Sequence, residues 1–248
     1  MIVQLAMYPF PHLREHQASL WAAVRAHLAE APDELDVDTE LHAVWHRPDL
    51  LVGQTCGWPL VTELHGEVEV IGTFDVNVPF ASNGRYRSVL VANKPIGLHE
   101  WQRNPGTIVA RNNADSLSGW VSLCNVWGSV PDNVVETGAH LESMRTVARG
   151  HANVAIIDAV SYEFITEMEP FTSALVHVIG HGPVIPCVPL VMSVDLAHRR
   201  DEVRAALAAA VVDPAVAGAC ARLRIRGFVP FDRADYEYVR DLWPRPAS

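Results

Sequence analysis

Hydroxyl and imidazole groups recur at two places where helices are expected to begin. Ser116 and Ser118, followed by Gly119, come directly after an expected strand and open an expected helix, and Thr137 and His140 do the same further along the chain. Hydroxyl protons, free backbone N–H groups and the positive end of the helix dipole together attract anions. The two segments therefore predict contacts to a small anion, although Ser116 and Thr137 would equally serve as ordinary helix caps.

Further polar residues stand at comparable positions. Asp158 follows the apolar segment 154–157, where a carboxylate needs a partner; it would accept a hydrogen bond from a ligand or cap the next helix. His140, in the first turn of its helix, has its proton affinity lowered by the helix dipole, which suits either a neutral donor to a ligand or an exposed surface residue. The remaining candidate contacts are Tyr8, Gln54, Thr55, Tyr86 and Ser88.

These candidates are positioned by an alternation of strands and helices. Strands are expected over 2–7, 50–52, 67–73, 86–92, 107–111, 133–136, 154–157, 176–179 and 188–193. Helices are expected around 20–28 and over 39–46, 59–64, 116–126, 139–149, 200–212 and 233–243. Such alternation is typical of mainly parallel sheets flanked by helices, and ligands of these α/β folds bind beyond the carboxyl ends of the strands.

The pattern is interrupted twice, which predicts two lobes. The polar stretch 81–85 separates two series of strands and helices, and Gly180-His181-Gly182-Pro183 looks like the return crossing. We therefore expect a discontinuous first lobe made of residues 1–80 plus 183–248, a second lobe made of residues 81–182, and a ligand cleft between them.

Charge and hydropathy exclude several classes of partner. The chain has 19 Lys and Arg against 29 Asp and Glu, and its net charge of −10 would repel a nucleic-acid backbone. No run of about 18 apolar residues is present, so no membrane insertion is expected. The N-terminal segment lacks a basic region and its apolar run ends at Pro9, so the chain as written is expected in the cytoplasm, or in the periplasm or outside the cell if a signal peptide was removed.

Motifs for metal or cofactor chemistry are weak. The four cysteines form no Cys-x-x-Cys pair. Histidines four apart occur at 12/16, 42/46 and 177/181, but Ala43 stands where a zinc protease has its glutamate. No nucleophile elbow, phosphate-binding P-loop or Gly-x-Gly-x-x-Gly turn is present. We expect no metal and no cofactor, and we assign no catalytic residue.

Four segments carry a likeness to a known family. They are PDLLVGQTCG at 48–57, YRS at 86–88, NNADSLSG at 112–119, and TGAH at 137–140 with ARG at 148–150 and VAIID at 154–158. Their order and spacing resemble those of the phosphate/phosphite/phosphonate substrate-binding proteins of ABC transporters, a branch of the type 2 periplasmic-binding-protein fold. The resemblance implies two α/β lobes joined by two crossover strands that act as a hinge.

The resemblance also implies a function, the binding of a small polar ligand that carries an oxyanion, such as a phosphonate or phosphate. Its partners would be that ligand and, if the protein is exported, an ABC transporter permease. Similar hinged folds also serve cytosolic biosynthetic enzymes, so an enzyme in which His140 or Asp158 acts as acid or base stays open as the alternative. A sensor domain that binds the same ligand is a third possibility.

Overall fold

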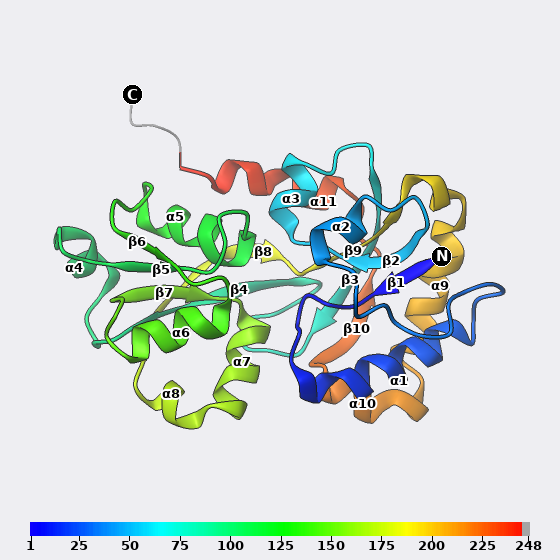
Figure 1. The fold of residues 1–248 in the computed structure, drawn as a ribbon, viewed down its shortest axis with the longest axis horizontal. Helices are drawn as coiled ribbons and strands as arrows, with labels where there is room; N and C mark the ends of the chain where they lie inside the picture. The colour runs from blue at the N-terminus through cyan, green and yellow to red at the C-terminus, as the bar shows by residue number, and fades with distance from the viewer. Residues whose placement is uncertain (245–248) are drawn as a thin grey trace. The chain divides into compact units, whose positions relative to one another are not determined.

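The computed structural model describes residues 1–244, which fold into two compact units (Figure 1). Unit 1 comprises Met1–Asn77, Ala81–Arg85 and Pro186–Glu237, and unit 2 comprises Val78–Phe80, Tyr86–Ile185 and the chain from Tyr238. Each unit contains one five-stranded sheet flanked by helices. The two-lobe α/β fold class expected from the sequence is confirmed.

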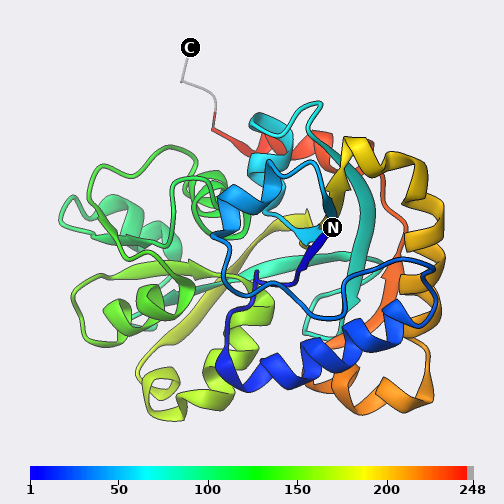
Figure 2. The ribbon, with the colours of Figure 1, turned by 45° about the vertical axis from the view of Figure 1, so that its right-hand side comes forward.

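In unit 1 the sheet has the strand order β1-β2-β9-β3-β10. Its strands are β1 (Ile2–Gln4), β2 (Leu50–Gln54), β3 (Val68–Val76), β9 (Pro189–Ser193) and β10 (Ile225–Val229). Its helices are α1 (Arg14–Arg25), α2 (Leu41–Trp45), α3 (Gly57–Thr62), α9 (Arg200–Ala210), α10 (Ala217–Arg222) and α11 (Ala234–Glu237). Leu20, Trp21 and Val24 recur at helical spacing on α1 and are buried, and α1 lies beside α9 and α10 (Figure 2).

In unit 2 the strand order is β6-β5-β7-β4-β8. Its strands are β4 (Arg85–Ala92), β5 (Val109–Arg111), β6 (Val134–Glu136), β7 (Val154–Ile157) and β8 (His177–Pro186). Its helices are α4 (Leu98–Arg103), a π-helical turn η2 (Leu117–Val121) that runs into α5 (Ser122–Trp127), α6 (His140–Ala148), α7 (Ala159–Met168), α8 (Pro170–Ala174) and a terminal 3₁₀ turn η5 (Tyr238–Leu242).

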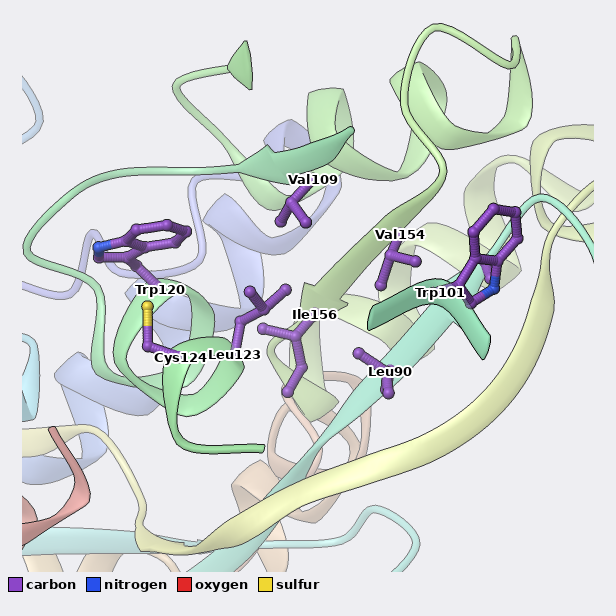
Figure 3. Packing of buried hydrophobic residues seen from close by; sticks show 9 residues of the cluster. Leu90, Trp101, Val109, Trp120, Leu123, Cys124, Val154 and Ile156 are labelled. Carbon is purple, nitrogen blue, oxygen red and sulfur yellow. The ribbon is translucent and has the colours of Figure 1, made fainter. Parts of the chain in front are cut away.

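A buried apolar cluster fixes η2 and α5 on this sheet (Figure 3). Trp120 and Leu123 from the helical segment pack with Leu90 of β4 and Ile156 of β7. Burial of side chains of this size stabilises the packing by roughly 1.5–3 kcal/mol each. The loop that joins β5 to η2 is therefore held between two anchored elements.

The strand directions correct one expectation, that of mainly parallel sheets. Among the described pairs, β1–β2, β5–β6 and β5–β7 are parallel, whereas β2–β9, β3–β9, β3–β10 and β4–β7 are antiparallel. Each sheet is mixed because long strands such as β3 and β4 pair with segments that return from distant parts of the chain. The alternation of strands and helices along the sequence does not show which strands become neighbours in this way.

Two further segments differ from their expected structure. Residues 180–183, expected to be the return crossing between the lobes, lie inside the long strand β8, where a Cβ added at Gly182 would approach Ile156 Cδ1 to 3.1 Å. The helix expected over 233–243 divides into α11 and η5. Strand β10 and helices α4 and α10 were not expected, because they are short and carry no clear periodicity.

Within residues 1–244, no single helix is long and apolar enough to cross a bilayer. Two consecutive helical segments, Val194–Ala210 and Pro214–Arg222, are together long and apolar enough, but the chain bends by 68° between them. Val203, Ala206 and Leu207 of the first segment are buried within unit 1.

Candidate functional site

Ser116 stands at the start of η2, directly after the loop from β5. Its Oγ accepts the Gly119 backbone N–H at 3.0 Å and an amide N–H of Asn112 at 2.9 Å. The Val121 N–H reaches back to the Ser116 carbonyl at 2.9 Å, five residues away, which makes this turn π-helical. Ser116 therefore caps the turn as the sequence allowed, and single π turns occur frequently at functional sites.

Gly119 leaves room for a buried amide. A Cβ at this position would lie 1.9 Å from Oδ1 of Asn112 and 2.8 Å from Oγ of Ser116. Any other residue would displace both side chains, so glycine is required here for close approach rather than for its backbone angles.

His140 is the first residue of α6 and meets the η2 turn through its ring. Its Nε2 lies 3.3 Å from Ser118 Oγ and 3.3 Å from Asn112 Nδ2, and its Nδ1 lies 3.4 Å from the Asp158 backbone nitrogen. Burial lowers the pKa of His140, while the Asp158 carboxylate and the Ile156 carbonyl act in the opposite direction. The net direction is downward, so the imidazole is neutral at pH 7.

Asp158 caps α7 and is almost fully buried. Its Oδ1 accepts the Ser161 N–H at 2.8 Å, and its Oδ2 accepts the Tyr86 hydroxyl. Tyr86 is buried as well, at the start of β4. This pair ties β4 to the beginning of α7, and it sets a carboxylate next to His140.

Thr137 does not cap α6. The N-cap residue is Ala139, whose side chain makes no capping hydrogen bond. Thr137 Oγ1 instead donates to the Arg111 carbonyl at 3.1 Å and lies 2.7 Å from Ser143 Oγ. Its hydroxyl thus joins the end of β5 to α6. Ser88 is fully buried, and its Oγ has no hydrogen-bond partner in the structure.

The expected contacts of unit 1 form a separate group. Gln54, at the end of β2, accepts the Met7 N–H through Oε1 at 3.2 Å. Thr55 is buried, and its N–H donates to the Pro189 carbonyl at 3.1 Å. Tyr8 follows Met7, and its carbonyl lies 3.5 Å from Nε2 of Gln17. The structure thus brings Tyr8, Gln54 and Thr55 to the carboxyl ends of β1 and β2.

Apart from Asp158, the group in unit 2 consists of neutral side chains. Arg111, the last residue of β5, is paired with Glu136 at 2.5 Å and lies over the Trp120 ring. Within the described part of the chain, no three His, Cys, Asp or Glu side chains gather as a metal site would require. Asn112 also belongs to this group, although the sequence did not predict it as a site residue. The one feature that could have indicated it is its position immediately after β5.

Comparisons with known proteins decide the family. Residues 56–236, more than half of the chain, match the model of the ABC transporter phosphonate periplasmic substrate-binding proteins. The chain belongs to this family. The resemblance noted in the sequence is confirmed, and members of this phosphonate-binding family are transporter components rather than enzymes.

Solved structures support the same fold. A Xanthomonas citri protein with bound chloride matches with a TM-score of 0.70 and 16% identity, over 97% of this chain and 98% of its own. PhnD1 from Prochlorococcus marinus in complex with methylphosphonate matches with a TM-score of 0.62 and 13% identity, over 92% and 81%. A binding protein component of an ABC phosphonate transporter from Pseudomonas aeruginosa matches with a TM-score of 0.65 and 15% identity, over 92% and 71%. A search of curated proteins found no match.

Proposed function

We propose that the Ser116 and Ser118 hydroxyls, held beside His140, bind the oxyanion of a phosphonate-like ligand. The observation that carries the proposal is the convergence of these side chains from two strand-to-helix loops, with Ser118 Oγ and His140 Nε2 3.3 Å apart. Hydroxyl donors suit phosphonate oxygens, and the π turn that holds the serines is packed firmly on the sheet. We name these three residues the donor cluster.

The charges around the donor cluster favour a singly charged oxyanion. The three side chains are neutral at pH 7. The backbone nitrogen of Asp158 lies 3.4 Å from His140 Nδ1, so the buried Asp158 carboxylate is close to the cluster. A doubly charged ligand would be repelled by that carboxylate in a region of low dielectric. A ligand oxygen that carries a proton avoids this repulsion, so monoanionic methylphosphonate is the first probe to use; PhnD1 from Prochlorococcus marinus was solved with methylphosphonate.

The remaining predicted contacts supplement this cluster. Four of them keep the cluster in position through the hydrogen bonds described above: Gly119, Thr137, Tyr86 and Asp158. We propose Ser88 as a further buried donor. For unit 1, ligand contact through Tyr8, Gln54 and Thr55 stays a prediction, to be tested by replacing Gln54 with Leu.

Isothermal titration calorimetry at pH 7 with methylphosphonate, phosphate and sulfate tests the proposal. We expect Ser118→Ala to weaken methylphosphonate binding by about tenfold or more, since hydrogen bonds to charged groups contribute roughly 1.5–3 kcal/mol. Ser173→Ala is the matched control, because this hydroxyl bonds to Thr166 within unit 2, outside the donor cluster. Equal affinities of Ser118→Ala and wild type would reject the proposal.

Mass spectrometry of the recovered ligand separates binding from catalysis. We expect methylphosphonate to return unchanged, as for a transporter component; a change in mass would favour the enzyme alternative with His140 or Asp158 as acid or base. Membership of the family further leads us to propose a periplasmic location and an ABC transporter permease as partner. Cell fractionation and co-purification with the permease test both.

A further inference from the structure

We infer that Asn112 is a positioning residue, which makes the hydroxyls of the donor cluster donate to the ligand. Asn112 is more than nine-tenths buried, directly after β5. The inference rests on the proposed function, since it states how the same cluster comes to select an oxyanion.

Both hydrogens of the Asn112 amide are directed at the donor cluster. Nδ2 lies 2.9 Å from Ser116 Oγ and 3.3 Å from His140 Nε2. An amide nitrogen can only donate, so both of these atoms must accept. Oδ1 is buried without a hydrogen-bond partner and faces Gly119, where an added Cβ would lie 1.9 Å from it.

For Ser116, the consequence is a hydroxyl that can only donate. Its oxygen accepts two hydrogens, from Asn112 Nδ2 and from the Gly119 N–H at 3.0 Å. A hydroxyl has two acceptor lone pairs and one hydrogen. With both lone pairs engaged, the hydrogen is all that Ser116 offers a ligand, and a ligand oxygen is the atom that accepts it.

For His140, Asn112 selects the tautomer. The Asp158 N–H, 3.4 Å from Nδ1, calls for an unprotonated Nδ1, whereas a hydrogen bond from the ring to the Ile156 carbonyl calls for a ring N–H. The Asn112 amide needs Nε2 as its acceptor, so the hydrogen resides on Nδ1 and is donated to the Ile156 carbonyl. Nδ1 then accepts no hydrogen bond from the Asp158 N–H. The single lone pair of Nε2 is then occupied, and the Ser118 hydroxyl, 3.3 Å away, keeps its hydrogen for the ligand.

The test combines ¹⁵N NMR of histidine-labelled protein with calorimetry. In the ligand-free wild type we expect a pyridine-type resonance for Nε2 of His140 and a pyrrole-type resonance for Nδ1, assigned by their loss in His140→Gln. Asn112→Asp keeps the shape but has no hydrogens to donate. We expect it to move the proton to Nε2 and to weaken methylphosphonate binding by about tenfold or more.

Asn93→Asp is the matched control. Asn93 also donates through Nδ2, to the Ala152 carbonyl at 3.2 Å, and its Oδ1 is also buried without a partner, but it lies at the end of β4 away from the donor cluster. We expect this variant to retain the wild-type His140 resonances and affinity.

A pyrrole-type Nε2 in the wild-type protein would overturn the inference, and this measurement needs no variant to fold. Wild-type affinity in Asn112→Asp would overturn it as well. If the wild type bound no oxyanion, the proposed function would fail, while the NMR result would still decide whether Asn112 sets the tautomer.

Discussion

At the scale of single residues, the candidate site depends on which side chains have a hydrogen free to donate to a ligand, more than on their charges. Ser116, Ser118 and His140 could be predicted, because hydroxyl and imidazole groups after strands are visible in the sequence. Asn112 could not, because its role depends on which atoms meet once β5, η2 and α6 are packed. The space that Gly119 leaves for Asn112 is likewise a property of the folded chain.

Replacing Gly119 with Ala tests this close approach. The new Cβ would overlap Asn112 Oδ1, 1.9 Å away, so we expect a loss of about 1–3 kcal/mol in the free energy of unfolding together with weaker methylphosphonate binding. Gly97→Ala is the control, since a Cβ at Gly97 meets no atom within 4 Å. Urea denaturation and calorimetry measure both effects; equal stability of the two variants would contradict the geometry.

Replacing Tyr86 with Phe tests the support given to Asp158. The variant removes the hydroxyl that donates to a buried carboxylate, so we expect a loss of roughly 1.5–3 kcal/mol in the free energy of unfolding. Tyr238→Phe removes an exposed hydroxyl that donates to the Val184 carbonyl, and should cost less than about 1 kcal/mol. Similar urea midpoints for both variants would argue against a stabilising role of the Tyr86 hydroxyl.

The lowered pKa of His140 gives a stability change with a defined sign. Burial lowers the pKa of His140, and burial with the charge of Arg87 lowers the pKa of His181. As pH falls through about 6.5, these two histidines bind protons in the unfolded chain but not yet in the folded chain. The free energy of unfolding therefore falls from pH 7.5 to pH 5.5. We expect His140→Gln to reduce this loss of unfolding free energy, measured by urea denaturation at both pH values. The part of the loss that comes from His181 should remain. An unchanged fall would show that His140 does not contribute.

At the scale of elements, strand-to-helix loops were predictable and strand directions were not. The segments 107–111 and 154–157 are largely apolar and are followed by polar residues, which places β5 and β7 and their following loops correctly to within two residues. β10 was missed because its sequence, IRGFV, alternates poorly and pairs with β3 across a gap of about 150 residues in the chain. Non-local pairing of this kind leaves no local signal.

Gly72 marks the place where β10 approaches β3, and its replacement tests that pairing. A Cβ at Gly72 would lie 2.5 Å from the Phe228 ring and 2.6 Å from the Val229 carbonyl oxygen, so Gly72→Ala must push β10 away. We expect a loss of about 2–3 kcal/mol in the free energy of unfolding and faster hydrogen exchange in β10.

The control for this variant lies in the same pair of strands. A Cβ at Gly227 would be 3.8 Å from Asp75 Cβ, an ordinary contact, so Gly227→Ala should leave both the unfolding free energy and the exchange rates nearly unchanged. A loss of equal size in Gly227→Ala would mean that the effect is not due to close approach.

At the scale of the whole molecule, the sequence predicted two α/β units because its alternation of strands and helices is interrupted near residues 81–85. The structure contains two such units, and the family model covers residues 56–236, which include parts of both. The expectation of one mostly parallel sheet per lobe failed, because several strands return directly beside a partner. In unit 2, β5, η2 and α6 assemble the donor cluster that we propose as the oxyanion site.

The measurement that tests this claim most directly is backbone NMR of the intact protein titrated with methylphosphonate. We expect the largest chemical-shift changes at the amides of 116–119 and at His140, saturating together at one ligand per chain. Saturable binding with these resonances unmoved, or no change at any resonance, would contradict the account.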